Sequence, residues 1–411
     1  MEKKRIWLVS HYAMPPRLEV RVKTIRFAKI LQRRGYDVTL VTASTIHNSD
    51  VNLIEDKSLY VEREYDGLRY VHIRCDGYRG SGVKRILNMF QFQNRFAKAM
   101  KRFAKPDAIV ADCNCINYRG ILKYARKNKI AFVSEIRDLW PLSIVEYKNI
   151  SASNPIIRYL YGQEKRMYKL SDAIIFSMEG GKDYIRDKGW EKQVDLDKVF
   201  YINNGIDGDQ IVSQVDTDMR ADGVFRVVYA GSIRQVNDLD TVLDCAKLLG
   251  ETHPWVRFDL YGDGDQRERL EKRCADEQIA NVRFLGSVPK EAVGGICRSA
   301  QLNLINVQPS GISRYGVSWN KLFDYMAAGR PILSTLKVRY DLIDRYRCGI
   351  STEEQTPQAI ADAIVEIAEL PQQEYTQMCE RARAAATDFD FETLTDRLEA
   401  VVQYACERKE K

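Results

Sequence analysis

At 411 residues the chain is too long for one ordinary hydrophobic core, and this length suggests about two or three domains, of which we expect two. A hydrophobic content of 45%, 10% aromatic residues and only 11 prolines describe a folded, soluble protein and exclude a low-complexity chain. The net charge of +6 is modest for this size, so any basic binding surface must be local.

The N-terminal stretch MEKKRIWLVSHY starts with basic residues, but its apolar run IWLV is far shorter than a signal-peptide core or a membrane span. We therefore expect a cytoplasmic protein. The cysteines are odd in number and scattered, which is not typical of a disulfide framework, and the four histidines add no zinc-binding spacing. We expect no metal site and no cofactor. The cysteines lie at 75, 113, 115, 245, 274, 297, 348, 379 and 406.

Short apolar runs alternate with helical patterns along the first half of the chain. In order they are RIWLVS, a helix near 20–34, YDVTLVTAS, LRYVHIRC, a helix near 83–104, DAIVADC, IAFVSEIRD, DAIIFS and KVFYINNG. After a polar break at about 207–223 the pattern restarts with FRVVYAGS, VRFDLYGDG, VRFLGSV, LNLINV and PILST, and the chain ends in helical segments. The alternation predicts parallel βαβ units in two α/β domains, 1–207 and 208–390, with a ligand site in the cleft between them, at the carboxyl ends of strands.

The segment GVSWNKLFDYMAAGRP, residues 316–331, predicts a helix that lies on a core. Ser318 is its expected N-cap, and Gly329 with Pro331 ends it. Asn320, Lys321 and Asp324 then lie off the buried face near the helix N-terminus, where free N–H groups and the helix dipole attract anions. This window alone leaves an anion site and a solvated face with an i, i+3 ion pair equally open. The apolar face consists of Trp319, Leu322, Phe323, Met326 and Ala327.

Two short motifs are weak functional signals, and a third motif is missing. Ser318 to Lys321 matches S-x-x-K of penicillin-binding enzymes, but the chain has neither S-D-N nor K-T-G. Asp263 and Asp265 form a D-x-D pattern that can bind metal, yet it lies in a strand-to-helix turn, where aspartate is common as a turn or cap residue. No G-x-G-x-x-G follows the first strand, where HYAMPPRLEVR stands, which argues against a dinucleotide oxidoreductase.

The order and spacing of several stretches resemble family 4 retaining glycosyltransferases of the GT-B fold, over nearly the whole chain. These stretches are HYAMPP, RRGYDVTLVT, EIRDLWP, SDAIIFS, NNGID, VVYAGSI, DLYGDGDQRERLE, VRFLGSV and NKLFDYMAAGRPIL. The resemblance implies an α/β fold of two Rossmann-like parallel-sheet domains facing across a cleft, with a C-terminal helix, 391–411, crossing back to the N-terminal domain. EIRDLWP and NKLFDYMAAG look most like the branch that builds bacterial surface polysaccharides, such as O-antigen or capsule.

The resemblance implies a hexosyltransferase that moves a sugar from a nucleotide-diphosphate sugar, with a UDP-sugar favoured, to a glycan or polyprenyl-diphosphate-linked acceptor. Neither a metal nor a nucleic acid takes part. Retention without an obvious nucleophile would proceed through an oxocarbenium-like transition state, while the leaving diphosphate takes the acceptor's proton; the protein then supplies positioning and charge stabilisation. A catalytically silent GT-B-like binding subunit and a sugar-nucleotide epimerase are the alternatives.

Donor-binding residues follow from the resemblance position by position. Asp324, one methylene shorter than the usual glutamate, is expected to accept the ribose hydroxyls, and Lys321 to contact the diphosphate. The usual first glutamate is replaced by Gly316, the usual arginine by Ser232 and a later lysine by Asn237. Arg234 could replace the missing diphosphate contact, or it could be an ordinary surface arginine. The expected donor-binding set is Gly231, Arg234, Gly262, Tyr315, Gly316, Asn320, Lys321 and Asp324.

In the N-terminal half the family's active-site histidine falls on Arg137, with Asp138 beside it. The two residues are assigned, with Lys321, to catalysis, although a purely structural strand-end pair is the alternative. His11 and Lys23 are assigned to the acceptor side.

A basic and apolar stretch at 79–106 suggests a possible membrane contact on the acceptor side. Arg95, Lys98 and Arg102 fall on one helical face, and no acidic residue interrupts the stretch. Such a helix can lie in an anionic membrane interface, which would make the protein peripheral at the inner face of the cell membrane. The alternative is an ordinary amphipathic helix whose aromatic face packs on the sheet. Its apolar face comprises Met89, Phe92, Phe96, Met100 and Phe103.

Overall fold

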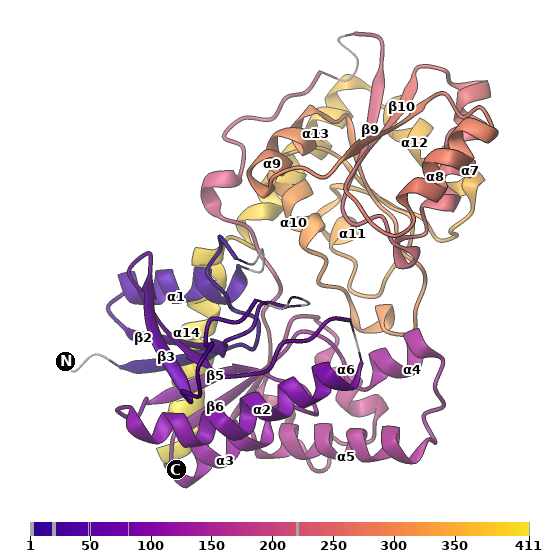
Figure 1. The fold of residues 1–411 in the computed structure, drawn as a ribbon. Helices are drawn as coiled ribbons and strands as arrows, with labels where there is room; N and C mark the ends of the chain where they lie inside the picture. Colours follow the sequence, from indigo (N-terminus) through magenta and orange to yellow (C-terminus); the bar gives the residue numbers. More distant parts are fainter. Residues whose placement is uncertain are drawn as a thin grey trace. The chain divides into compact units, whose positions relative to one another are not determined.

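The computed structural model describes residues 4–18, 22–47, 49, 51–80, 82–218 and 222–410. The chain divides into two compact units, an N-terminal unit of Met1–Asn203 with Leu394–Lys411 and a C-terminal unit of Asn204–Thr393. Each unit is an open sheet covered by helices (Figure 1). This is the expected α/β fold of two Rossmann-like units.

The N-terminal unit contains an eight-stranded sheet in the order β3-β4-β2-β1-β5-β6-β7-β8. All neighbouring strands are parallel except β3 and β4. The central strands are buried along nearly their whole length, as expected for parallel strands with helices on both faces. The strands are β1 Arg5–Val9, β2 Asp37–Ala43, β3 Tyr60–Tyr65, β4 Leu68–Ile73, β5 Ala108–Asp112, β6 Ala131–Ile136, β7 Ala173–Phe176 and β8 Val199–Tyr201.

The sequence reading missed β3, which forms an antiparallel hairpin with β4 at one edge of the sheet. Asp66 and Gly67 connect the two strands, and both have positive φ, 50° and 75°. A two-residue Asp-Gly connection with this conformation is a strong hairpin signal, because its twist matches the twist of the strands. The information was therefore present in the sequence, but the half-exposed and charged strand YVEREY lacks a buried apolar run.

The helices of the N-terminal unit are α1 Lys23–Arg33, α2 Val83–Ala99, α3 Arg119–Lys127, α4 Leu142–Lys148, α5 Pro155–Leu170, α6 Gly181–Asp187 and α14 Phe391–Glu410. Short 3-10 turns lie at Met100–Arg102 and Leu196–Lys198. Although α14 is last in sequence, it runs beside the strands of this unit (Figure 1). Arg34 forms ion pairs with Asp396 and Glu399, and Arg408 pairs with Asp195, so the expected return of the C-terminal helix is confirmed.

The C-terminal unit contains a six-stranded parallel sheet in the order β11-β10-β9-β12-β13-β14. Its strands are β9 Phe225–Ala230, β10 Val256–Tyr261, β11 Val282–Gly286, β12 Leu302–Ile305, β13 Ile332–Ser334 and β14 Gly349–Ser351. Its helices are α7 Leu239–Thr252, α8 Arg267–Asp276, α9 Lys290–Ser299, α10 Asn320–Ala327, α11 Leu342–Tyr346, α12 Pro357–Ala368 and α13 Gln372–Thr387, with 3-10 turns at Gly208–Gln210, Gln235–Asn237 and Ser313–Tyr315.

The buried hydroxyl of Tyr325 links helix α10 to the central strands β9 and β12 of this sheet. The Ala230 backbone N–H donates to the Tyr325 hydroxyl oxygen at 2.9 Å, and that hydroxyl donates to the Leu304 carbonyl at 3.2 Å. Leu322, Phe323 and Met326 are buried on the same side, as their helical spacing predicts. The N-terminal part of α10 is thereby held close to the carboxyl end of β9.

Candidate functional site

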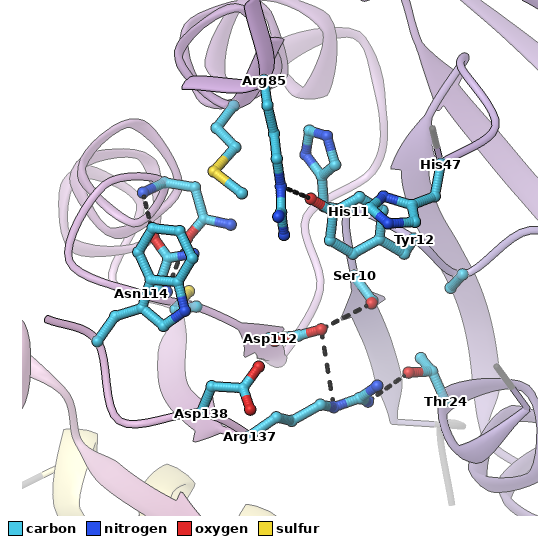
Figure 2. Close-up of a pocket in the computed structure, with 15 residues that line it drawn as sticks. Ser10, His11, Tyr12, Thr24, His47, Arg85, Asp112, Asn114, Arg137 and Asp138 are labelled. Carbon is cyan, nitrogen blue, oxygen red and sulfur yellow. Dashed lines mark hydrogen bonds and ion pairs between the residues drawn. The ribbon is translucent and has the colours of Figure 1, made fainter. Parts of the chain in front are cut away.

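A polar pocket of about 160 Å³ lies at the carboxyl ends of β1, β5 and β6 in the N-terminal unit (Figure 2). The carboxyl ends of parallel strands are where ligands bind in open α/β sheets, because the loops that follow them diverge there. The pocket is lined by Ser10, His11, Tyr12, Ala13, Thr24, His47, Arg85, Met89, Asp112, Cys113, Asn114, Asn117, Arg137, Asp138 and Trp140.

Arg137 forms part of a chain of charges at the strand ends. Its guanidinium donates to Glu135 Oε2 at 2.9 Å and to Thr24 Oγ1 at 2.7 Å, and its Nε lies 3.7 Å from Asp112 Oδ2. Ser10 donates to the same Asp112 oxygen at 3.0 Å (Figure 2). These contacts hold the guanidinium in one orientation at the pocket wall.

Lys23 completes the charge chain beneath the pocket. Its ammonium lies 2.9 Å from Glu135 Oε1 and donates to the Ile202 carbonyl at 3.0 Å, and only 6% of the side chain is exposed. Burial alone would raise the pKa of Glu135, but Arg137 and Lys23 outweigh it and lower the pKa to about 2. Burial lowers the pKa of Lys23, against the attraction of Glu135. Glu135 therefore stays ionised and anchors both cations.

His11 faces the pocket as a neutral imidazole. Its Nε2 lies 2.5 Å from Asn88 Oδ1, and burial lowers its pKa to about 4. On the opposite side Asp138 is exposed beside Arg137 (Figure 2). The structure thus brings three expected residues, His11, Arg137 and Asp138, into one pocket. Lys23 does not line this pocket, because its ammonium is committed to Glu135 below it.

Sequence reasoning missed two carboxylates near Arg137: Asp112, which lines the pocket, and Glu135, which does not line it but pairs with Arg137. Asp112 is the last residue of β5, and Glu135 is the penultimate residue of β6. Their positions at strand ends were visible in DAIVADC and IAFVSEIRD, but nothing in either stretch shows that both acids face Arg137. Burial raises the pKa of Asp112, while Arg137 opposes that shift.

In the C-terminal unit two glycines allow the chain to turn tightly after β9 and β10. A Cβ on Gly262, whose φ is +134°, would lie 1.7 Å from the Gly231 carbonyl oxygen, so no other residue fits. A Cβ on Gly231 would lie 2.9 Å from Lys321 Nζ. Close packing therefore requires glycine at 262, while Gly231 leaves the space that the lysine side chain occupies.

Lys321 extends from the first turn of α10 over the ring of Tyr229, with Nζ 4.2 Å from the ring centroid. The Tyr229 hydroxyl donates to the Ser232 carbonyl at 2.8 Å, which fixes the ring beneath the ammonium. Burial lowers the pKa of Lys321 to about 7. Among the described residues no carboxylate forms an ion pair with it, so this partly buried cation at a helix N-terminus has an aromatic face as its partner.

Asp324 lies one turn further along α10 and is already paired. Both carboxylate oxygens accept from Lys290 Nζ of α9, at 2.7 and 2.8 Å, and only 13% of the Asp324 side chain is exposed. Burial raises the pKa of Asp324, whereas Lys290 lowers it. The i, i+3 ion pair between Lys321 and Asp324 that the sequence left open is absent: the aspartate pairs with Lys290, a residue that sequence reasoning missed.

The prediction that Ser318 caps α10 was wrong. The helix begins at Asn320 with Trp319 as N-cap, and no side chain caps it. Ser318 instead lies before the helix, where its carbonyl accepts from Asn204 Nδ2 at 2.9 Å.

Gly316, where the family's glutamate is missing, has a φ of +86°. A glutamate would be strained at this backbone conformation. The glycine therefore fits the conformation of the loop, which a glutamate would not. Tyr315 is buried beside it, and Asn320 is exposed at the start of α10. Arg234 is exposed, and no hydrogen bond or ion pair of its side chain is found in the described structure, so its assignment to the diphosphate stays a prediction.

Ser232 and Asn237 stand where the family usually has an arginine and a lysine, and they are hydrogen-bonded to each other. Asn237 Nδ2 donates to the Ser232 carbonyl at 2.7 Å and to its hydroxyl at 3.0 Å. Asp263 uses its carboxylate to accept from the next backbone N–H, that of Gly264, at 2.8 Å, as a turn residue does. The described part of the chain contains no group of three or more His, Cys, Asp or Glu side chains placed to hold a metal ion.

Helix α2 buries the apolar face that the sequence suggested for either core or membrane. Met89, Phe92, Phe96 and Met100 are each at most 1% exposed, so this face belongs to the core. Arg95 bonds the Arg74 carbonyl at 2.7 Å, whereas Lys98 and Arg102 are exposed. A second apolar group on the outer side was missed: Val83, Ile86, Leu87 and Phe90 are 71%, 38%, 54% and 40% exposed.

The helices of the described ranges include none that is long and apolar enough to span a membrane.

Comparison with known proteins identifies the family. A model of Glycosyltransferase Family 4 matches residues 21–210, and a model of Glycosyl transferases group 1 matches residues 224–369. A probable glycosyltransferase, WbjE of Pseudomonas aeruginosa, is 24% identical over 145 residues, which cover 34% of this chain and only 35% of that protein.

Solved structures share the fold over nearly the whole chain. Sucrose-phosphate synthase from Thermosynechococcus elongatus aligns with a TM-score of 0.71, 15% identity and 98% coverage of both chains. HepE from Anabaena, in complex with UDP and glucose, aligns with a TM-score of 0.66 and 15% sequence identity, and the alignment covers 98% of this chain and 100% of that one. WaaG, a glycosyltransferase involved in lipopolysaccharide biosynthesis, aligns with a TM-score of 0.65 and 14% sequence identity. That alignment covers 97% of this chain and 99% of the WaaG chain. With family models matching both halves, this chain belongs to the family 4 glycosyltransferases of the GT-B fold.

Proposed function

We propose that this protein transfers a hexosyl group from a nucleotide-diphosphate sugar, with a UDP-sugar favoured, to a glycan or polyprenyl-diphosphate-linked acceptor, with retention of anomeric configuration. The main supporting observation is Lys321, a partly buried ammonium in the first turn of α10 that forms no ion pair with a carboxylate of the described residues. A diphosphate beside it would supply the missing negative charge, and the helix dipole would act on the same group. HepE, which shares the fold, was solved with UDP-glucose bound.

The proposed reaction needs little covalent chemistry from the protein. The bond from the anomeric carbon to the diphosphate breaks, the acceptor oxygen bonds to the same face of that carbon, and the acceptor's proton passes to the departing diphosphate. Lys321 would stabilise the negative charge that develops on the diphosphate, without a metal ion. In the N-terminal pocket Asp138 would accept a hydroxyl of the acceptor, and Arg137 would donate to the acceptor or the sugar.

A role in surface-polysaccharide synthesis at the inner face of a bacterial cell membrane belongs to the same proposal. It is supported by the partial match to WbjE and by the shared fold of WaaG. Exposed Leu87 and Phe90 on α2, together with exposed Lys98, offer a small apolar and basic surface of the kind that rests on an anionic bilayer.

The deciding experiment incubates the protein with radiolabelled UDP- and GDP-sugars and separates the products. Hydrolysis or transfer with an α-configured product from an α-configured donor supports the proposal. Isomerised nucleotide sugar would instead indicate an epimerase. Absence of any binding would indicate a silent subunit, and Lys321→Met serves as the matched negative control.

A further inference from the structure

We propose that Arg85 binds a phosphate group of the acceptor, so that the pocket of the N-terminal unit selects a phosphorylated acceptor over a neutral glycan. This inference rests on the proposed transferase function and names the acceptor class of the same pocket. It is argued from the position, the partners and the charge of Arg85.

Arg85 extends from the first turn of α2 into the pocket (Figure 2). Its guanidinium carbon lies 5.9 Å from the centroid of the Tyr12 ring and 5.8 Å from that of the Trp140 ring, and its Nε donates to the Tyr12 hydroxyl at 3.3 Å. Two aromatic rings and one hydroxyl hold the side chain, and they leave most of its five N–H donors without a protein acceptor.

The pocket contains a second arginine with a different charge environment. Arg137 is neutralised by Glu135 and Asp112. No carboxylate of the described chain lies within ion-pairing distance of Arg85, and the nearby His11 is neutral because burial lowers its pKa to about 4. Arg85 is therefore the pocket cation whose positive charge is available to a ligand.

The two walls of the pocket suit two parts of such a ligand. Asp112 and Asp138 lie at the strand ends, opposite α2, where carboxylates can accept sugar hydroxyls (Figure 2). The α2 wall holds Arg85, and a guanidinium is matched to the paired oxygens of a phosphate. An acceptor with hydroxyls at one end and a phosphate ester at the other fits both walls. The phosphate can belong to a lipid-linked sugar or to a water-soluble sugar phosphate.

The test measures binding by calorimetry in the presence of saturating UDP, so that the nucleotide site is occupied. The probes are glucose 1-phosphate, geranyl diphosphate, inorganic diphosphate, and the neutral compounds methyl glucoside and geraniol. We expect the wild-type protein to bind at least one phosphorylated probe about tenfold or more tightly than its neutral counterpart. Tighter binding of geranyl diphosphate would indicate a lipid-linked acceptor, and tighter binding of glucose 1-phosphate a soluble one.

Arg85→Gln should weaken the phosphorylated probes about tenfold or more and leave methyl glucoside and geraniol unchanged, while Arg85→Lys should restore part of the affinity. Arg126→Gln, an exposed arginine of α3, is the matched control. Melting temperature and UDP affinity, measured in every variant, separate a local effect from unfolding. The proposal is overturned if no phosphorylated probe binds, or if Arg85→Gln binds them like wild type. If the wild-type protein does not bind UDP at all, that result would instead contradict the proposal that a UDP-sugar is the donor.

Discussion

At Lys321 the free protein holds a partly buried amine beside an aromatic ring, and this burial lowers its pKa from 10.5 to about 7. Between pH 7 and 10.5 the unfolded chain holds this proton and the folded chain does not. The free energy of unfolding therefore rises with pH in that window through this group. In the proposed complex a bound diphosphate would raise the pKa of Lys321 again, so donor binding would take up a proton above pH 7.

The first prediction is that the affinity for UDP-glucose falls as the pH rises from 7 to 8.5, by up to about tenfold per pH unit. Titration calorimetry in buffers of different ionisation enthalpy should detect about one proton taken up at pH 8.5. In Lys321→Met the affinity should be about tenfold or more weaker at pH 6 and should no longer change with pH. Equal affinity of the wild-type protein at pH 6 and 8.5 would contradict the assignment.

Asp324 tests the ribose contact separately from the diphosphate contact. Lys290 forms an ion pair with this largely buried carboxylate, whose remaining lone pairs can accept two hydroxyls. Asp324→Asn should weaken UDP about tenfold, because an amide accepts fewer hydrogen bonds than a carboxylate, and it should barely change the affinity for 2′,3′-dideoxy-UDP. Glu291→Gln, on the exposed side of α9, is the control. Equal loss for both nucleotides would place Asp324 away from the ribose.

At the scale of elements, α2 has two apolar sides, and only one of them belongs to the core. The inner side, with Met89, Phe92 and Phe96, packs on the sheet. The outer side exposes Leu87 and Phe90, with basic residues further along the helix. A helix with an unburied apolar side and no acidic residue is a candidate for the interface of an anionic bilayer.

We predict that the protein sediments with anionic vesicles more than with neutral ones, and that binding weakens as salt rises. Lys98→Glu with Arg102→Glu should weaken binding at low salt by about 1 kcal/mol per removed charge or more. Leu87→Ser with Phe90→Ser should weaken the part of the binding that salt does not remove. The control pair Arg257→Glu with Lys272→Glu changes the net charge equally in the C-terminal unit. Equal sedimentation of all variants would leave α2 as a core helix only.

For the whole molecule, the proposed charge stabilisation comes from protein groups. In the proposed complex Lys321 would be the cation that contacts the diphosphate, whereas Asp263 accepts a hydrogen bond from the backbone of its own turn. We therefore predict that EDTA leaves the rate of transfer unchanged and that added manganese or magnesium does not raise it by more than about twofold. A strict requirement for either ion would contradict this prediction and make Asp263 and Asp265 the candidate metal ligands.

The alternation of apolar runs and helical patterns was sufficient to predict two parallel α/β units, because burial of a strand and of one helix face follows local periodicity. The loop glycines Gly231 and Gly262 and the strand-end pair Arg137 and Asp138 were identified through the family resemblance, because the motifs that carry it are contiguous stretches of sequence. The edge strand β3 was predictable from its Asp-Gly turn, although the reading missed it.

Only the tertiary structure decided which side chains meet. Lys290 reaches Asp324 across 34 residues, and Lys23 meets Glu135 through a sheet order that no window of sequence contains. The two apolar sides of α2 look alike to a helical wheel, and packing against the sheet determines which one is buried. The same packing places Arg85 in the pocket with no carboxylate of the described chain within ion-pairing distance. Charge pairing depends on distances between elements, and these are set by the order of the strands and the packing of helices on them, whereas periodicity reports only which residues avoid water.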